Sequence, residues 1–194
     1  RRAAQTYWEQ ASTLKESYRE RTKLGVSGRD VRVPLRDVAA FLKTAGALLD
    51  RLFVGKNREK LLSKGGVPYT YFVNDVTDHE PTGNHDALGH PTVVPLQFQQ
   101  RPVKLFLEGP VHWIKHRRAE AKAVYDAVAR SPLFDRKLKM YKNCENMRGE
   151  SPELGRAIGA YPRGWIENES IYLHMEYKYL LELLRAGLCE EFWK

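Results

Sequence analysis

Apolar side chains that recur at helical spacing constrain the fold of this 194-residue chain more than any other feature. The clearest repeat lies between residues 35 and 53 and places apolar groups on one broad helical face, namely Val38, Phe41, Leu42, Ala45, Leu48, Leu49 and Leu52. Pro34 precedes it and suits the first turn of a helix. Similar spacing predicts helices over residues 3–21, 103–116, 119–130, 132–141, 168–186 and from 188 onward. We therefore expect an all-α fold of antiparallel helical hairpins, with function on the connecting loops.

The middle of the chain departs from this periodicity. Residues 67–73 are aromatic and β-prone, which predicts a short strand or an extended segment. Residues 74–95 are rich in Asp, His, Gly and Pro, so we expect a long loop of the kind that is usually functional or disordered. Its three histidines, His79, His85 and His90, follow no standard metal-ligand spacing, and no metal site is expected.

Composition limits the partners and the setting. The net charge is +8, but 24 acidic residues are interspersed among 32 basic ones, so we expect solvated helix faces and not a nucleic-acid surface. The chain contains no run of 18 apolar residues, so no membrane helix is predicted. Cys144 and Cys189 do not have the spacing of metal ligands. We expect a reducing, cytoplasmic setting. Because the chain starts at Arg1 and stops at Lys194 inside a helical pattern, we expect one truncated domain over residues 1–194.

The stretch from Tyr161 to His174 is the strongest candidate for a functional site. A Pro/Gly turn precedes an aromatic side chain, two carboxylates, an amide and an imidazole; the candidate ligand-binding residues are Trp165, Glu167, Asn168, Glu169 and His174. Such a rim suits a saccharide. The alternative is structural, with Asn168 or Ser170 capping a helix, the glutamates complementing its dipole and Trp165 packing as a hydrophobic staple. The residues alone favour neither interpretation.

A second set of polar side chains precedes another predicted helix. Gln100 and Arg101 stand where a chain segment leads into the pattern that starts near residue 103. They are either part of an ordinary helix start or a second element of the same saccharide rim.

The Tyr161–His174 stretch resembles a motif of the cellobiose phosphorylase family, glycoside hydrolase family 94. In that family a Tyr-Pro-x-Gly turn leads into Glu-Asn-Gly-Gly, an aliphatic residue, an aromatic residue, one further residue and a His. The resemblance extends over about residues 65–194. It implies part of an (α/α)6 barrel and transfer of a glycosyl unit from a β-glucoside or oligosaccharide to inorganic phosphate with inversion. Phosphate is then a co-substrate, no cofactor is implied, and Glu167 is the residue expected to contact the sugar.

The chain also departs from the family pattern. Glu169-Ser170 stands where the family has Gly-Gly, and no match to the family's general-acid Asp motif is found in residues 1–64. We therefore assign no catalytic residue and expect an incomplete barrel. Two alternatives stay open: an inverting glycoside hydrolase on the same barrel, which needs two carboxylates, and a non-catalytic helical domain for carbohydrate binding or interaction. A homodimer is left open as its assembly.

Overall fold

The computed structural model describes residues 2–53, 55–150, 154 and 161–194. The chain divides into two compact units. The first, Arg1–Asp50 with Asn74–Arg101, is called the hairpin unit below, and the second, Arg51–Val73 with Pro102–Lys194, is called the helical unit. Each is described by itself.

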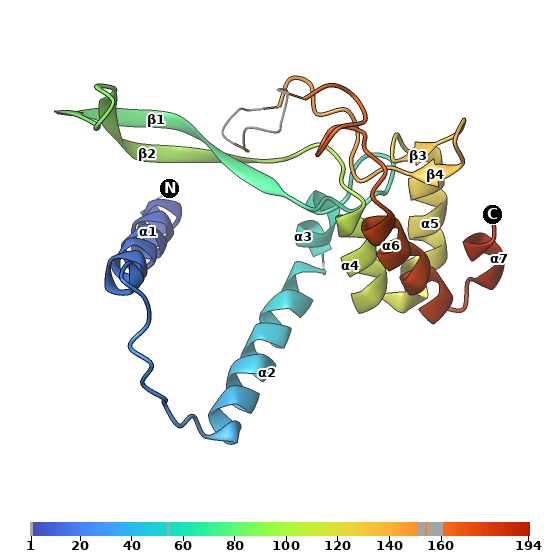
Figure 1. Cartoon of the computed structure of the whole chain (residues 1–194), viewed down its shortest axis with the longest axis horizontal. Helices are drawn as coiled ribbons and strands as arrows, with labels where there is room; N and C mark the ends of the chain where they lie inside the picture. Colours follow the sequence, from blue (N-terminus) through green and yellow to red (C-terminus); the bar gives the residue numbers. More distant parts are fainter. Residues whose placement is uncertain (1, 54, 151–153, 155–160) are drawn as a thin grey trace. The chain divides into compact units, whose positions relative to one another are not determined.

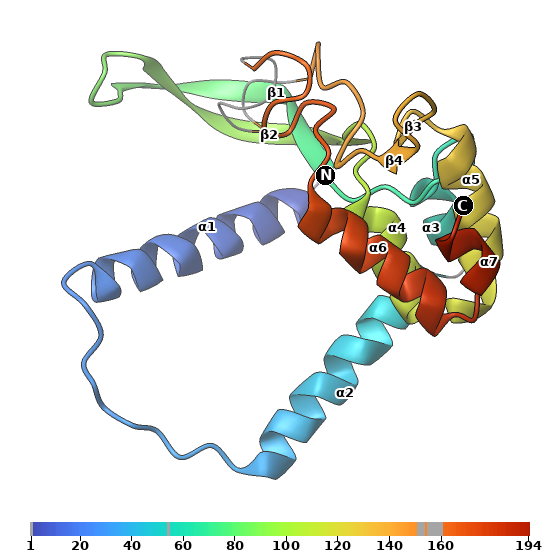
Figure 2. The ribbon, with the colours of Figure 1, turned by 45° about the vertical axis from the view of Figure 1, so that its right-hand side comes forward.

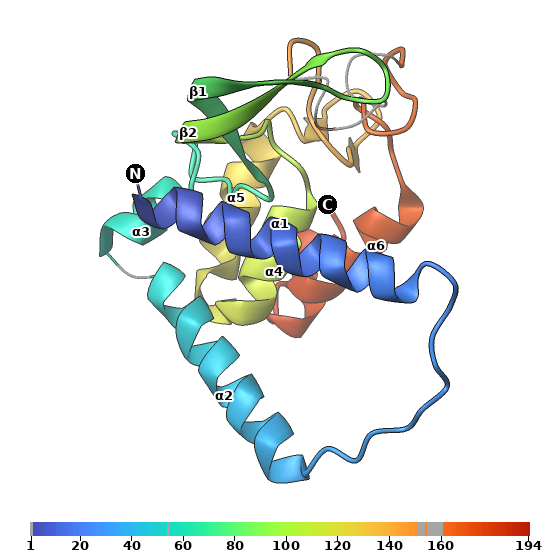
Figure 3. The same ribbon diagram turned by 90° about the vertical axis from the view of Figure 1, so that its left-hand side faces the viewer.

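The hairpin unit contains helices α1 (Arg2–Thr22) and most of α2 (Leu35–Leu52), joined by an extended segment (Figure 3). It also contains most of β1 (Phe72–His85) and β2 (Pro91–Pro102), which form a long two-stranded antiparallel ribbon (Figure 1). Both helices confirm the predictions made from apolar spacing for residues 3–21 and 35–53. The ribbon replaces the long loop expected over residues 74–95.

The ribbon forms because its turn is strongly specified. The Asp86 side chain accepts hydrogen bonds from the backbone N–H groups of Leu88 (2.8 Å) and His90 (2.9 Å). These two bonds hold the pKa of Asp86 below its usual range. Backbone pairing then continues along both strands, and polar side chains do not prevent it, because the ladder uses only main-chain groups.

The expectation of an all-α chain forming part of an (α/α)6 barrel is therefore wrong. The fold mixes helices with two antiparallel hairpins. The second hairpin, β3 (Phe134–Asp135) with β4 (Met140–Tyr141), replaces the helix expected over 132–141 and pairs Phe134 with Tyr141. Here Asp135 accepts bonds from the N–H groups of Lys137 and Leu138, both at 3.0 Å, and so closes a turn that competes with a helix.

The helical unit is built on α4 (Glu108–His116), which packs against both α5 (Ala121–Arg130) and α6 (Leu173–Arg185). Figure 2 shows α6 lying along α4. Shorter elements complete the unit: α3 (Gly55–Lys60), the 3-10 helix η1 (Arg118–Glu120) and α7 (Cys189–Phe192). The core between the main helices is fully buried at Leu107, Ile114, Val128, Tyr179 and Leu183.

Helix α4 begins at Glu108 and not near residue 103, because the backbone before it is bonded elsewhere. The N–H of Val103 donates to the carbonyl of Tyr71, and the N–H of Leu107 donates to that of Asn143, both at 2.9 Å. The first turn of α4 then meets the backbone of residues 68–70. A Cβ at Gly109 would lie 2.6 Å from the Pro68 carbonyl oxygen, so this crossing requires glycine.

Candidate functional site

The segment 161–172 folds as a tight turn and not as the start of a helix. Gly164, Ile166 and Glu169 adopt left-handed backbone conformations, with φ of 87°, 46° and 59°. The N–H of Gly164 donates to the carbonyl of Asn168 at 2.7 Å and closes the turn. A left-handed conformation is unfavourable for a β-branched residue such as Ile166, and strain of this kind gathers at functional sites.

Helix α6 consequently begins at Leu173, five residues later than expected. Its N-cap residue is Tyr172, and no side chain caps it. The capping interpretation of Asn168 and Ser170 is therefore wrong, because the helix starts after them and neither side chain bonds its first turn. The carbonyl of Ser170 accepts a 2.7 Å bond from the N–H of Asn143.

Asn168 is buried, and its side chain holds the turn in place through two hydrogen bonds. Its Oδ1 accepts a bond from the N–H of Met147 (3.2 Å), and its Nδ2 donates to the carbonyl of Tyr161 (2.9 Å). Both ends of the amide are thus used inside the protein. Asn168 therefore holds the turn together, and its contact with a ligand stays a prediction.

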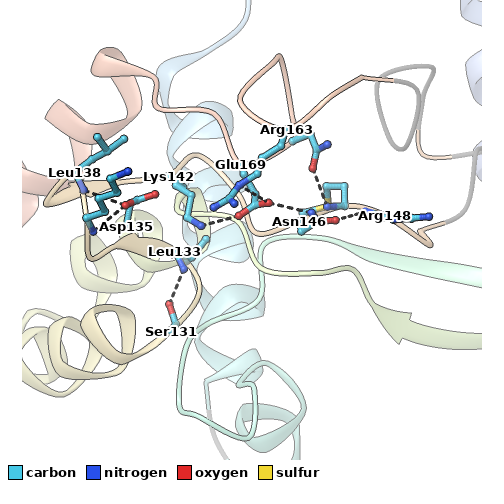
Figure 4. Close-up of polar contacts among 12 residues, drawn as sticks. Ser131, Leu133, Asp135, Leu138, Lys142, Asn146, Arg148, Arg163 and Glu169 are labelled. Atoms are coloured by element: carbon cyan, nitrogen blue, oxygen red, sulfur yellow. Dashed lines mark hydrogen bonds and ion pairs between the residues drawn. The ribbon is translucent and has the colours of Figure 1, made fainter.

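Glu169 is the centre of a polar cluster (Figure 4), in which its own side chain and that of Lys142 are buried while Asn146 and Arg163 are exposed. One carboxylate oxygen lies 2.8 Å from Lys142 Nζ, and the other lies 2.9 Å from Asn146 Nδ2 and 3.1 Å from Arg163 Nε. Burial raises the pKa of this carboxyl, but the bonds from Lys142 and Asn146 and the nearby positive charges outweigh burial, so the pKa falls below its usual range. Glu169 is an ionised anchor whose hydrogen-bonding capacity is taken up within the protein.

Trp165 and Glu167 have the opposite character. The Trp165 side chain is 59% exposed, and Glu167 is half-buried. Within the part of the chain that the structure describes, Glu167 makes no hydrogen bond or ion pair. The turn therefore presents an accessible aromatic face and an unengaged carboxylate two residues apart, held by the Asn168 and Glu169 contacts beneath.

Tyr71 and Glu108 form a further polar pair in the same unit. The Tyr71 hydroxyl donates to Glu108 Oε2 at 2.7 Å. Partial burial, this bond and the charges of Glu108 and Glu167 together raise the pKa of Tyr71 to about 12. The charge of Glu167 thus acts on the Tyr71–Glu108 pair. The sequence pattern does not predict this pairing of Tyr71 with Glu108.

His174 lies in the first turn of α6 with its side chain exposed. Its ring stacks on Tyr172, with the ring centroids 5.5 Å apart and the planes 21° apart. The imidazole is therefore oriented by an aromatic neighbour and open to solvent.

Gln100 and Arg101 belong to the hairpin unit and contact the neighbouring strand. Gln100 Nε2 lies 3.4 Å from Asn74 Oδ1, and Arg101 Nε lies 2.7 Å from Asp75 Oδ2. These contacts pin the base of the ribbon. Their membership of a saccharide rim stays a prediction.

Within the described residues, no group of three His, Cys, Asp or Glu side chains is placed to hold a metal ion. His90 instead contacts Asp86, with 3.1 Å between Nδ1 and Oδ2. No helix among the residues searched is both long enough and apolar enough to cross a membrane.

No protein-family model, curated protein or solved structure matches this chain.

Proposed function

We propose that the turn at Trp165–Glu169 is the sugar-binding wall of a glycoside phosphorylase, which transfers a glycosyl unit from a β-glucoside or oligosaccharide to inorganic phosphate with inversion. One observation carries the proposal. Glu167 offers a half-buried carboxylate without a hydrogen-bond partner among the described residues, two positions after the exposed Trp165. A pyranose has an apolar face for the ring and hydroxyl donors for the carboxylate.

The rigidity beneath these two side chains supports a binding role. A ligand gains affinity when its site is ordered before it arrives. Asn168 is held at both ends of its amide, and Glu169 is held by three side chains, so the two residues that directly follow Glu167 are fixed.

The backbone of Glu169 supports the resemblance to the cellobiose phosphorylase family. That family has Gly where this chain has Glu169, and the residue has a φ of 59°, which glycine adopts without strain. The same turn geometry would therefore suit both residues. In this chain the added side chain contacts Lys142, Asn146 and Arg163 and leaves the sugar contact to Glu167.

Phosphate dependence tests the reaction. Purified protein is incubated with cellobiose and longer β-glucosides, with and without inorganic phosphate, and the products are separated. We expect sugar 1-phosphate only when phosphate is present, because phosphate is the attacking group. Free sugar released equally in both samples would instead establish a hydrolase, and no product with intact sugar binding would establish a non-catalytic domain.

Binding is tested with two variants and matched controls. Glu167→Gln and Trp165→Ala should each weaken oligosaccharide binding by about tenfold or more in calorimetry, a loss of about 1.4 kcal/mol. Glu190→Gln and Trp193→Ala change exposed residues of the same types near α7 and should leave affinity unchanged. Equal affinity in all four variants would remove the turn from the site.

A further inference from the structure

The helical unit contains a second concave site that is separate from the Trp165–Glu169 turn. It is an open cavity of about 560 Å³, between the loop after α3, the end of α5, and the segments around residues 102–105 and 145–150. The site is called the α5 cavity below. Its volume is within the range of small-molecule sites in proteins, roughly 300–1,000 Å³.

The floor of the α5 cavity is apolar. Val67, Val103, Leu105 and Ala127 line it and are each almost fully buried, and half-buried Tyr69 adds an aromatic ring. A ring-sized organic group laid on this floor would remove apolar surface from water on both sides, which is favourable.

Two cations on the lining are unengaged. Lys64 and Arg130 have exposed side chains, and the described residues provide neither with a hydrogen-bond or ion-pair partner. They come from different parts of the chain, one from the loop after α3 and one from the last turn of α5.

The other charged groups of the lining are already engaged in the wall. The ammonium group of Lys104 donates to the carbonyls of Asn146 (2.8 Å) and Arg148 (2.5 Å). Glu145 accepts from the N–H of Leu105 at 2.6 Å, and Glu150 accepts from the N–H of Lys104 at 3.0 Å. The charge left to meet a ligand is therefore chiefly that of the two unengaged cations.

We propose that the α5 cavity binds a small organic anion, with its phosphate or carboxylate between Lys64 and Arg130 and its ring on the apolar floor. Lysine and arginine are the usual partners of both anionic groups, and arginine can hold either one with two parallel bonds. The proposal does not depend on the function of the Trp165–Glu169 turn.

Calorimetry and amide NMR on the full chain test the site with four probes: glucose 1-phosphate, glucuronate, inorganic phosphate and glucose. We expect at least one organic anion to bind and to shift the amide signals of Lys64, Gly65 and Ser131. Glucose should bind at least tenfold more weakly because it lacks the anionic group, and inorganic phosphate should do so because it lacks the ring. Comparison of glucose 1-phosphate with glucuronate identifies the preferred anionic group, because both probes carry the same kind of ring.

The variant Lys64→Gln/Arg130→Gln should lower the affinity for the bound anion at least tenfold. Arg118→Gln/Lys194→Gln removes the same charge from exposed residues outside the cavity lining and should bind as the parent does. Failure of every probe to bind at millimolar concentration would overturn the proposal. Equal losses in the two double variants would also overturn it, since they would indicate only a general charge effect.

Discussion

The ammonium of Lys142 lies 2.8 Å from the carboxylate of Glu169, and the two side chains are only 8% and 9% exposed. Removing Glu169 leaves the buried ammonium of Lys142 without its ion-pair partner, which costs about 3 kcal/mol or more. We therefore expect Glu169→Gln to lower the free energy of unfolding by about 3 kcal/mol in urea titrations. Lys142→Met should lower it by less, because Glu169 keeps its contacts with Arg163 and Asn146. The double variant should lose clearly less than the sum.

A surface ion pair in the same unit is the control for that cycle. Lys122 Nζ lies 2.6 Å from Asp126 Oδ1, and both side chains are well exposed. Exposed pairs contribute about 1 kcal/mol or less, so Lys122→Met should barely change stability. Strict additivity of the Lys142 and Glu169 variants would show that the two groups do not act as a pair.

The pH dependence of this pair has a defined sign. Because the pKa of Glu169 is lowered in the folded protein, its contribution is complete at pH values above the ordinary glutamate pKa of about 4.3 and is lost as the pH falls through the folded value. The stability difference between the parent and Glu169→Gln should be constant from about pH 7 to about pH 5 and shrink below about pH 4. A difference that grows on acidification would contradict the ionised state.

The left-handed backbone of Glu169 predicts an inverted preference between glycine and alanine. Both Glu169→Gly and Glu169→Ala lose the three side-chain contacts, but only alanine keeps the steric cost of a φ of 59°. That cost is about 1–2 kcal/mol. We expect Glu169→Gly to be more stable than Glu169→Ala by about 1 kcal/mol in thermal or urea unfolding. Greater stability of the alanine variant would indicate that the turn relaxes.

Gly109 is expected to be intolerant of any side chain. An added Cβ would meet the Pro68 carbonyl oxygen at 2.6 Å and Thr70 Oγ1 at 2.8 Å. Because the backbone must move to make room for the added Cβ, Gly109→Ala should destabilise the helical unit by about 3 kcal/mol. Gly46→Ala is the control: it lies in α2 with nothing within 4 Å, and alanine there should stabilise the helix by about 0.5–1 kcal/mol. Similar effects of the two substitutions would be inconsistent with the close approach at Gly109.

The two cysteines should differ in reactivity. Cys144 is fully buried, and burial raises the pKa of its thiol to about 11, whereas Cys189 is exposed. The thiolate is the reactive form, so a thiol reagent at about pH 8 should label one cysteine in the native protein and two after unfolding. Cys189→Ser should abolish the native reaction. Rapid native labelling of that variant would place Cys144 within reach of solvent.

The sequence predicts elements whose signals are local and repeated. The apolar spacing over residues 35–53 and 119–130 correctly predicts α2 and α5, because a helix is set by neighbours three and four residues apart. The hairpins were missed for the same reason. β1 and β2 have no strong alternation of apolar residues, and their pairing depends on a turn made by one side chain, Asp86.

The internal contacts of the candidate residues could not be predicted from the sequence. Trp165 is exposed, whereas Asn168 and Glu169 are engaged in internal contacts. Lys142 and Asn146 lie more than twenty residues before Glu169 in the chain, and no spacing rule connects them to it. The substitution of a charged residue where the related motif has glycine was a signal that Glu169 must have a partner. It did not indicate which residue that partner is.

The segment from residue 142 to residue 150 serves two surfaces at once. Lys142 and Asn146 hold Glu169, while Glu145 and Glu150 form part of the α5 cavity wall. A substitution in this segment that reshapes one surface should therefore shift the other. Selection for the function of one surface should then constrain the residues of both. Among relatives of this chain, these four positions should diverge together as a set, even though two of them face one surface and two face the other.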